Sequence, residues 1–187
     1  MLPEYFEFLN PVKMLCGSGA LENIPYELDR LGVKKPLALV SRTLLEEGII
    51  ERIGGKLDAV IQSDIPKDSS FSLVDSIAQR AREEGCDGVL AIGGGSVLDA
   101  AKAVALLVTN PDSTLAEMSE TSVLQPRLPL IAIPTTAGTG SETTNVTVII
   151  DAVSGRKQVL AHASLKPDVA IIDAVLTEGV LSHVPAM

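Results

Sequence analysis

The chain has 187 residues, of which 46% are hydrophobic and 21% charged, and its formal net charge is −9. This composition is typical of a soluble globular domain, and the acidic balance disfavours nucleic acid and anionic membrane surfaces as partners, because phosphate groups are bound by basic stripes. No apolar stretch is long enough to span a bilayer, and the N-terminus has no signal-peptide pattern, so we expect a cytoplasmic protein whose two cysteines are free, buried thiols.

Short apolar runs alternate with helix-like patterns along the chain. Strands are expected at 12–15, 37–41, 59–62, 88–92, 130–133, 146–150 and 169–172, and helices near 21–31, 43–54, 71–81 and 97–108. Such alternation predicts βαβ units, and therefore an α/β fold with a Rossmann-like, mostly parallel sheet and helices on both faces. A ligand is then expected at the carboxyl ends of the strands.

A glycine triplet follows one of these strand ends. Gly93, Gly94 and Gly95 precede Ser96 and a helix-compatible run. Glycines here let backbone N–H groups approach a phosphate at a helix N-terminus, where the helix dipole favours negative charge. The alternative is a tight turn or close helix packing, with Ser96 and Asp99 forming a capping box.

A second loop of small polar residues follows the strand at 130–133. The segment from Pro134 to Thr144 contains five threonines, two glycines and a serine. Hydroxyls and free amides suit a pyrophosphate or a ribose better than a packed core. The alternative is a solvated surface loop, but two such loops at parallel strand ends favour a phosphorylated ligand.

Together these motifs resemble the iron-containing (group III) alcohol dehydrogenases and, more distantly, glycerol dehydrogenase and dehydroquinate synthase. The resemblance rests on Gly93-Gly94-Gly95-Ser96-x-x-Asp99-x-x-Lys102 and on the segment Pro134 to Glu142, and extends over nearly the whole chain. It implies an NAD(P)-binding α/β domain followed by an all-helical domain that holds Fe²⁺ or another divalent metal.

The resemblance also implies roles for individual residues. The glycine triplet, with Gly94, Gly95 and Ser96, would hold the pyrophosphate, and Asp99 would lie near the nicotinamide. The remaining implied cofactor contacts are Thr135, Thr136 and Thr139 along the adenosine and phosphate path, and Lys157 at the nicotinamide ribose.

The residue after the second strand bears on the choice of cofactor. Many relatives carry an acidic residue there, which would accept hydrogen bonds from the 2′-hydroxyl of the adenosine ribose, whereas this chain has Arg42. A carboxylate would repel a 2′-phosphate and an arginine would pair with it. We therefore expect NADP to be preferred over NAD.

The metal ligands that the resemblance implies, an aspartate and three histidines, would fall beyond Met187. His162 and His183 match none of them. We therefore expect residues 1–187 to form an NAD(P)-binding domain without the all-helical metal domain, holding neither a metal ligand nor a catalytic residue and inactive alone.

Three functions stay open at this point. The first is the cofactor-binding half of a metal-dependent dehydrogenase, which acts on a small alcohol or aldehyde and forms a homo-oligomer. The second is an NAD-using lyase of the dehydroquinate synthase type, and the third is a non-catalytic nucleotide-binding module. The threonine-rich segment favours the first.

Overall fold

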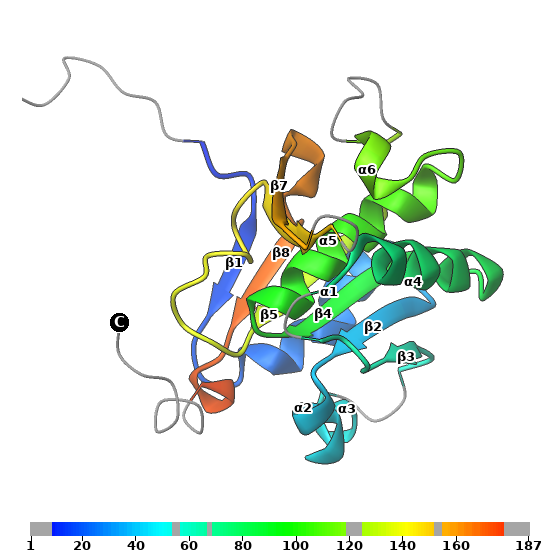
Figure 1. Cartoon of the computed structure of the whole chain (residues 1–187). Helices are drawn as coiled ribbons and strands as arrows, with labels where there is room; N and C mark the ends of the chain where they lie inside the picture. The colour runs from blue at the N-terminus through cyan, green and yellow to red at the C-terminus, as the bar shows by residue number, and fades with distance from the viewer. Residues whose placement is uncertain (1–8, 54–56, 67–68, 119–124, 152–154, 178–187) are drawn as a thin grey trace, which may run out of the picture.

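A six-stranded sheet is the centre of the computed structural model, which describes residues 9–53, 57–66, 69–118, 125–151 and 155–177 (Figure 1). Its strand order is β1–β8–β5–β4–β2–β3, and every neighbouring pair is parallel. The strands are β1 (Lys13–Cys16), β2 (Pro36–Val40), β3 (Val60–Gln62), β4 (Gly88–Gly93), β5 (Leu130–Pro134) and β8 (Val169–Ile172). The predicted Rossmann-like fold is confirmed, and this sheet is parallel throughout.

The helices of the described residues lie between successive strands, as expected from the alternating pattern, except η3, which follows β8. They are η1 (Ala20–Asn23), α1 (Ile24–Arg30), α2 (Arg42–Glu46), α3 (Ile49–Arg52), α4 (Phe71–Glu83), α5 (Gly95–Thr109), α6 (Leu115–Met118), η2 (Ala163–Leu165) and η3 (Ala174–Leu176). The single helix predicted near 43–54 is instead two short helices, α2 and α3. Gly48 separates them with a φ of 74°, a conformation that glycine adopts without steric cost.

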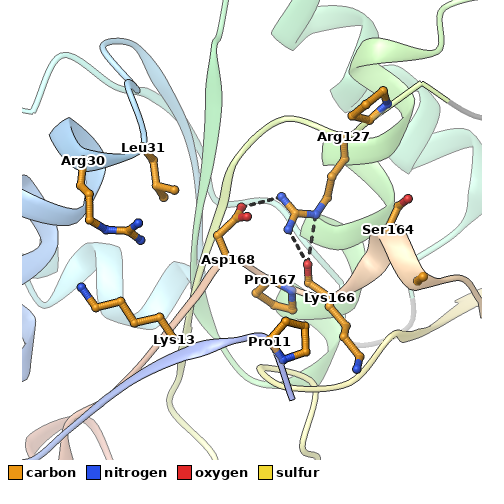
Figure 2. Close-up of a pocket in the computed structure, with 11 residues that line it drawn as sticks. Pro11, Lys13, Arg30, Leu31, Arg127, Ser164, Lys166, Pro167 and Asp168 are labelled. Atoms are coloured by element: carbon orange, nitrogen blue, oxygen red, sulfur yellow. Dashed lines mark hydrogen bonds and ion pairs between the residues drawn. The ribbon is translucent and has the colours of Figure 1, made fainter. Parts of the chain in front are cut away.

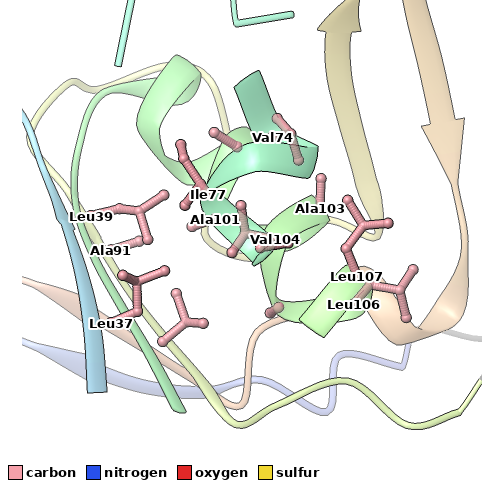
Figure 3. Close-up of a cluster of buried hydrophobic side chains, with 14 of the residues drawn as sticks. Leu37, Leu39, Val74, Ile77, Ala91, Ala101, Ala103, Val104, Leu106 and Leu107 are labelled. Carbon is pink, nitrogen blue, oxygen red and sulfur yellow. The ribbon is translucent and has the colours of Figure 1, made fainter. Parts of the chain in front are cut away.

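Two apolar cores cover the two faces of the sheet, because successive side chains of a strand point to opposite sides. Leu37 and Leu39 of β2 pack in the core beneath α4 and α5 (Figure 3), whereas Ala38 and Val40 join the core beneath α1 and α3. Within α5 every residue from Val97 to Leu107 is buried. This helix therefore has no solvated face along its middle turns, which is typical of a helix enclosed by other elements.

One predicted strand lies outside the parallel sheet. The run at 146–150 forms β6 (Val146–Ile150), which pairs in antiparallel fashion with β7 (Lys157–Ala161) as a separate two-stranded hairpin. β7 was not predicted from the sequence, and its side chains are exposed except for that of Leu160. The hairpin packs along α5 and so belongs to the surroundings of the glycine turn.

Candidate dinucleotide-binding site

The glycine turn occupies the topological switch point of the sheet. The chain runs from β2 outward to β3, returns to β4 on the other side of β2, and then continues to β5. Ligands of open α/β sheets bind in the crevice at such a point, beyond the carboxyl ends of the strands. Gly93 ends β4, Gly94 is the residue before α5, and Gly95 begins the helix. The helix dipole of α5 is therefore directed into this crevice.

The threonine loop rests directly on the glycine turn. A Cβ atom at Gly95 would lie 2.9 Å from Thr139 Cγ2, and one at Gly94 would lie 3.4 Å from Thr136. The Thr135 N–H donates to the Gly93 carbonyl at 3.0 Å. Only glycine leaves room at Gly95 for the loop in this position, so the two motifs form one continuous surface.

The loop residues differ in their access to a ligand. Thr139 is exposed and Thr136 is half-buried, whereas Thr135 is only 6% exposed. Gly138 and Gly140 on either side of Thr139 have φ values of 123° and 67°, so the loop curves back on itself in a conformation that favours glycine. Of the three predicted threonine contacts, Thr136 and Thr139 therefore have surface available to a ligand, whereas Thr135 has almost none.

Asp99 does not cap α5. Its Oδ2 accepts a hydrogen bond from the Val148 N–H of β6 at 3.0 Å, and its own carbonyl accepts one from Thr147 Oγ1 at 2.7 Å. Ser96 is the second residue of the helix rather than its cap, so the capping-box interpretation is wrong. Asp99 is buried, and this burial raises the pKa of its carboxyl. The positive charge of Lys102 acts in the opposite direction but does not cancel the effect.

Lys102 is fully buried one turn further along α5. Its Nζ donates to the Val146 carbonyl at 2.8 Å and to Thr144 Oγ1 at 3.1 Å, and lies 3.8 Å from Asp99 Oδ1. Burial lowers the pKa of Lys102 to about 8. No role was predicted for this side chain from the sequence, although its position in a largely apolar helix is a signal that it is enclosed.

These contacts determine where Lys157 lies. Because Val146 meets Lys102 and Val148 meets Asp99, β6 runs back along α5 toward its N-terminus. Ile150, at the end of β6, is the partner of Lys157 across the hairpin. The hairpin therefore carries Lys157, which is exposed, toward the glycine turn, as a contact with the cofactor requires.

Arg42 lies on the other side of the crevice. It is the first residue of α2, directly after the end of β2, and the Ser41 N–H before it donates to the Ile92 carbonyl of β4 at 3.0 Å. Arg42, the glycine turn and the threonine loop thus follow the carboxyl ends of β2, β4 and β5, which are neighbours in the sheet.

A cavity at the opposite, amino-terminal edge of the sheet is also rich in charge. It has a volume of about 530 Å³ and is lined by Lys13, Arg30, Arg127 and Asp168, among others (Figure 2). Arg127 pairs with Asp168 at 2.6 Å, and Lys13 and Arg30 share the buried carboxylate of Glu27. Three of its cations, Lys13, Arg30 and Arg127, are thus already paired with carboxylates.

The described residues contain no group of three or more histidine, cysteine or acidic side chains that could hold a metal ion. His162 Nδ1 accepts from the Ser164 N–H at 3.2 Å, and this caps η2; His183 lies outside the described residues. Cys86 is buried, whereas Cys16 is exposed, so the expectation of two buried thiols is wrong for Cys16. No helix in the described ranges could cross a membrane.

Comparison with known proteins then decides the family. The sequence model described as "Iron-containing alcohol dehydrogenase" matches residues 11–174. The chain belongs to the iron-containing alcohol dehydrogenase family. The match includes both the glycine turn and the threonine loop, and it agrees with the resemblance drawn from those motifs.

Curated members of the iron-containing alcohol dehydrogenase family extend further than this chain. A probable alcohol dehydrogenase EutG of Escherichia coli K12 is 59% identical over 186 residues, which are 96% of this chain and 47% of the relative. The NAD-dependent methanol dehydrogenase of Bacillus methanolicus is 33% identical over 90% of this chain and 46% of its own length. The chain thus spans about half the length of the curated relatives it matches.

Solved structures of iron-containing alcohol dehydrogenases and related reductases share the fold. The sulfoacetaldehyde reductase of Bifidobacterium kashiwanohense, solved in complex with NAD+, superimposes with a TM-score of 0.86 at 29% identity, over 94% of this chain and 48% of that one. The NADH-dependent butanol dehydrogenase A of Thermotoga maritima gives a TM-score of 0.84 at 27% identity, over 93% and 45% of the two chains.

Proposed function

We propose that residues 1–187 form an NAD(P)-binding domain, which serves a metal-dependent oxidoreductase acting on small alcohols or aldehydes. The observation that carries the proposal is the packing of Thr139 and Thr136 onto Gly95 and Gly94 at the switch point. A nicotinamide dinucleotide fits this surface, because the glycines leave the backbone accessible to a pyrophosphate. Family membership favours the dehydrogenase over a lyase of the dehydroquinate synthase type.

Each part of the proposed site has a distinct task. Gly94, Gly95 and Ser96 bind the pyrophosphate at the N-terminus of α5, and the loop hydroxyls of Thr136 and Thr139 orient it. Lys157 contacts the nicotinamide ribose, and Asp99 acts by holding β6 against α5. When bound, the cofactor supplies a hydride acceptor or donor at the nicotinamide ring.

Arg42 is proposed to favour NADP(H) over NAD(H). An arginine at the end of the second strand of such a sheet accommodates a 2′-phosphate, and Arg42 is exposed at that position. The homo-oligomer implied by the family resemblance stays a prediction.

The family's metal is not accommodated by the described residues, since they provide no ligand cluster. We therefore expect the 187-residue chain alone to oxidise no alcohol. Metal-dependent turnover by this chain would contradict that expectation.

A fluorescence titration of the chain with NADH and NADPH tests the proposal. We expect saturable binding of both, and weaker binding by a Gly95→Val variant, whose side chain would displace Thr139. A Gln79→Ala substitution on the exposed side of α4 serves as the matched control and should bind as the wild type does. Absence of saturable binding by the folded wild-type chain would overturn the proposal.

A further inference from the structure

Arg42 has a partner that the sequence did not predict. Its Nη2 forms an ion pair with Asp64 Oδ1, and the two side chains are 66% and 69% exposed. They face each other in a pocket of about 480 Å³ at the carboxyl ends of β2 and β3. The remaining residues that line this pocket are Ser41, Thr43, Ser63, Ile65 and Pro66.

The backbone of both strand ends presents this pair. The Ser41 N–H is bonded to the Ile92 carbonyl, which places Arg42 at the rim of the crevice. Just after β3, the Ile65 N–H donates to the Ser63 carbonyl at 2.9 Å, and Asp64 at the centre of this tight turn is exposed. Two elements of the parallel sheet therefore bring opposite charges together beside the switch point.

Arg42 and Asp64 favour different dinucleotides, NADP(H) and NAD(H) respectively. In sheets of this kind a carboxylate at the second strand end accepts a hydrogen bond from a ribose 2′-hydroxyl, whereas an arginine accommodates a 2′-phosphate. Here both groups share one pocket, and each limits the other. NADPH can engage Arg42 only by drawing its guanidinium away from Asp64.

We propose that Asp64 is a specificity-determining residue, which restrains Arg42 and so limits the preference for NADP(H). This inference rests on the proposed function, because it assigns the pocket to the adenosine ribose. The exchange of partners is feasible because exposed ion pairs contribute little to stability, whereas arginine binds phosphate through strong, often bidentate hydrogen bonds. Asp64 therefore limits the difference in affinity between NADPH and NADH, while both cofactors can still bind in the pocket.

The test compares four forms of the 187-residue chain: wild type, Asp64→Asn, Arg42→Gln and the double variant. Affinities are measured for NADH and NADPH, and also for AMP and adenosine 2′,5′-bisphosphate, which report on the adenosine pocket alone. Both substituted side chains are exposed, so the variants should fold, and circular dichroism checks this.

We expect Asp64→Asn to bind NADPH and the bisphosphate about tenfold more tightly, which corresponds to about 1.4 kcal/mol, with less than a twofold change for NADH and AMP. Arg42→Gln should weaken binding of NADPH and the bisphosphate, the two ligands with a 2′-phosphate, about tenfold. In the Arg42→Gln background the Asp64→Asn gain should largely disappear, because no guanidinium is left to release.

Equal changes for the ligands with and without a 2′-phosphate, or no change, would overturn the assignment of Asp64. A gain that persists undiminished in the double variant would also overturn it, since direct repulsion would then explain the effect. Failure of the wild type to bind any of the four ligands would instead refute the proposed function, so the two failures are distinguishable.

Discussion

The buried amine of Lys102 predicts a specific pH dependence of stability. Its pKa is about 8 in the folded chain, against an ordinary value of 10.5. Because the unfolded chain binds this proton more tightly between those two pH values, the free energy of unfolding rises with pH across that window. Below pH 8 the folded state bears the cost of burying the charge, and near pH 10.5 that cost is relieved.

The difference between the two pKa values corresponds to about 3 kcal/mol, at 1.36 kcal/mol per pKa unit. A Lys102→Met variant has no group to titrate at this position, so its stability should lack this rise. Other groups, such as the Cys86 thiol, whose pKa is raised by burial, are common to both chains. Their effects cancel when the two stabilities are subtracted.

The assay is urea unfolding followed by circular dichroism at intervals from pH 7 to pH 10.5, with wild type and variant measured side by side. We expect the free energy of unfolding of the wild type to rise by up to about 3 kcal/mol relative to that of Lys102→Met over this range. The stability of the variant relative to the wild type should be highest near pH 7. Parallel stability profiles for the two chains would refute the reasoning.

Three further predictions concern the glycine turn, an ion pair and the core. Gly95→Ala should weaken NADH binding about tenfold, because the new Cβ lies 2.9 Å from a Thr139 methyl; unchanged affinity in a titration would contradict this. Glu27→Gln should cost about 1–2 kcal/mol in urea unfolding at pH 7 and less in acid, since its two basic partners hold the pKa of Glu27 down against the effect of burial. Leu90→Ala, at a fully buried position, should cost about 2–5 kcal/mol, and a smaller loss in urea unfolding would indicate collapse of the cavity.

The sequence predicted the sheet well because its strands are continuous apolar runs buried on both faces, such as those of β4 and β5. The hairpin was harder to predict. β7 has one buried residue, Leu160, and its alternation is too weak to mark a strand, while β6 resembles a sheet strand locally and differs only in its partner.

The candidate site was predicted in part for a similar reason. Glycines and threonines at strand ends are local signals, so the glycine turn and its loop could be found from the sequence. The pairing of Arg42 with Asp64, and the contacts of Lys102 with Thr144 and Val146, join positions distant in the chain. No periodicity or motif encodes such contacts, because they depend on which strands lie side by side.

The place of β1 in the sheet has a consequence for synthesis of the chain. Among the described strands β1 pairs only with β8, so the earliest of these strands along the chain pairs with the latest. Until β8 has emerged, β1 must remain unpaired, and an unpaired strand is prone to aggregation during folding. Its exposed Lys13 provides the charge that protects such edges. We therefore expect completion of the sheet to be a late step, after the strands from β2 to β5 have assembled.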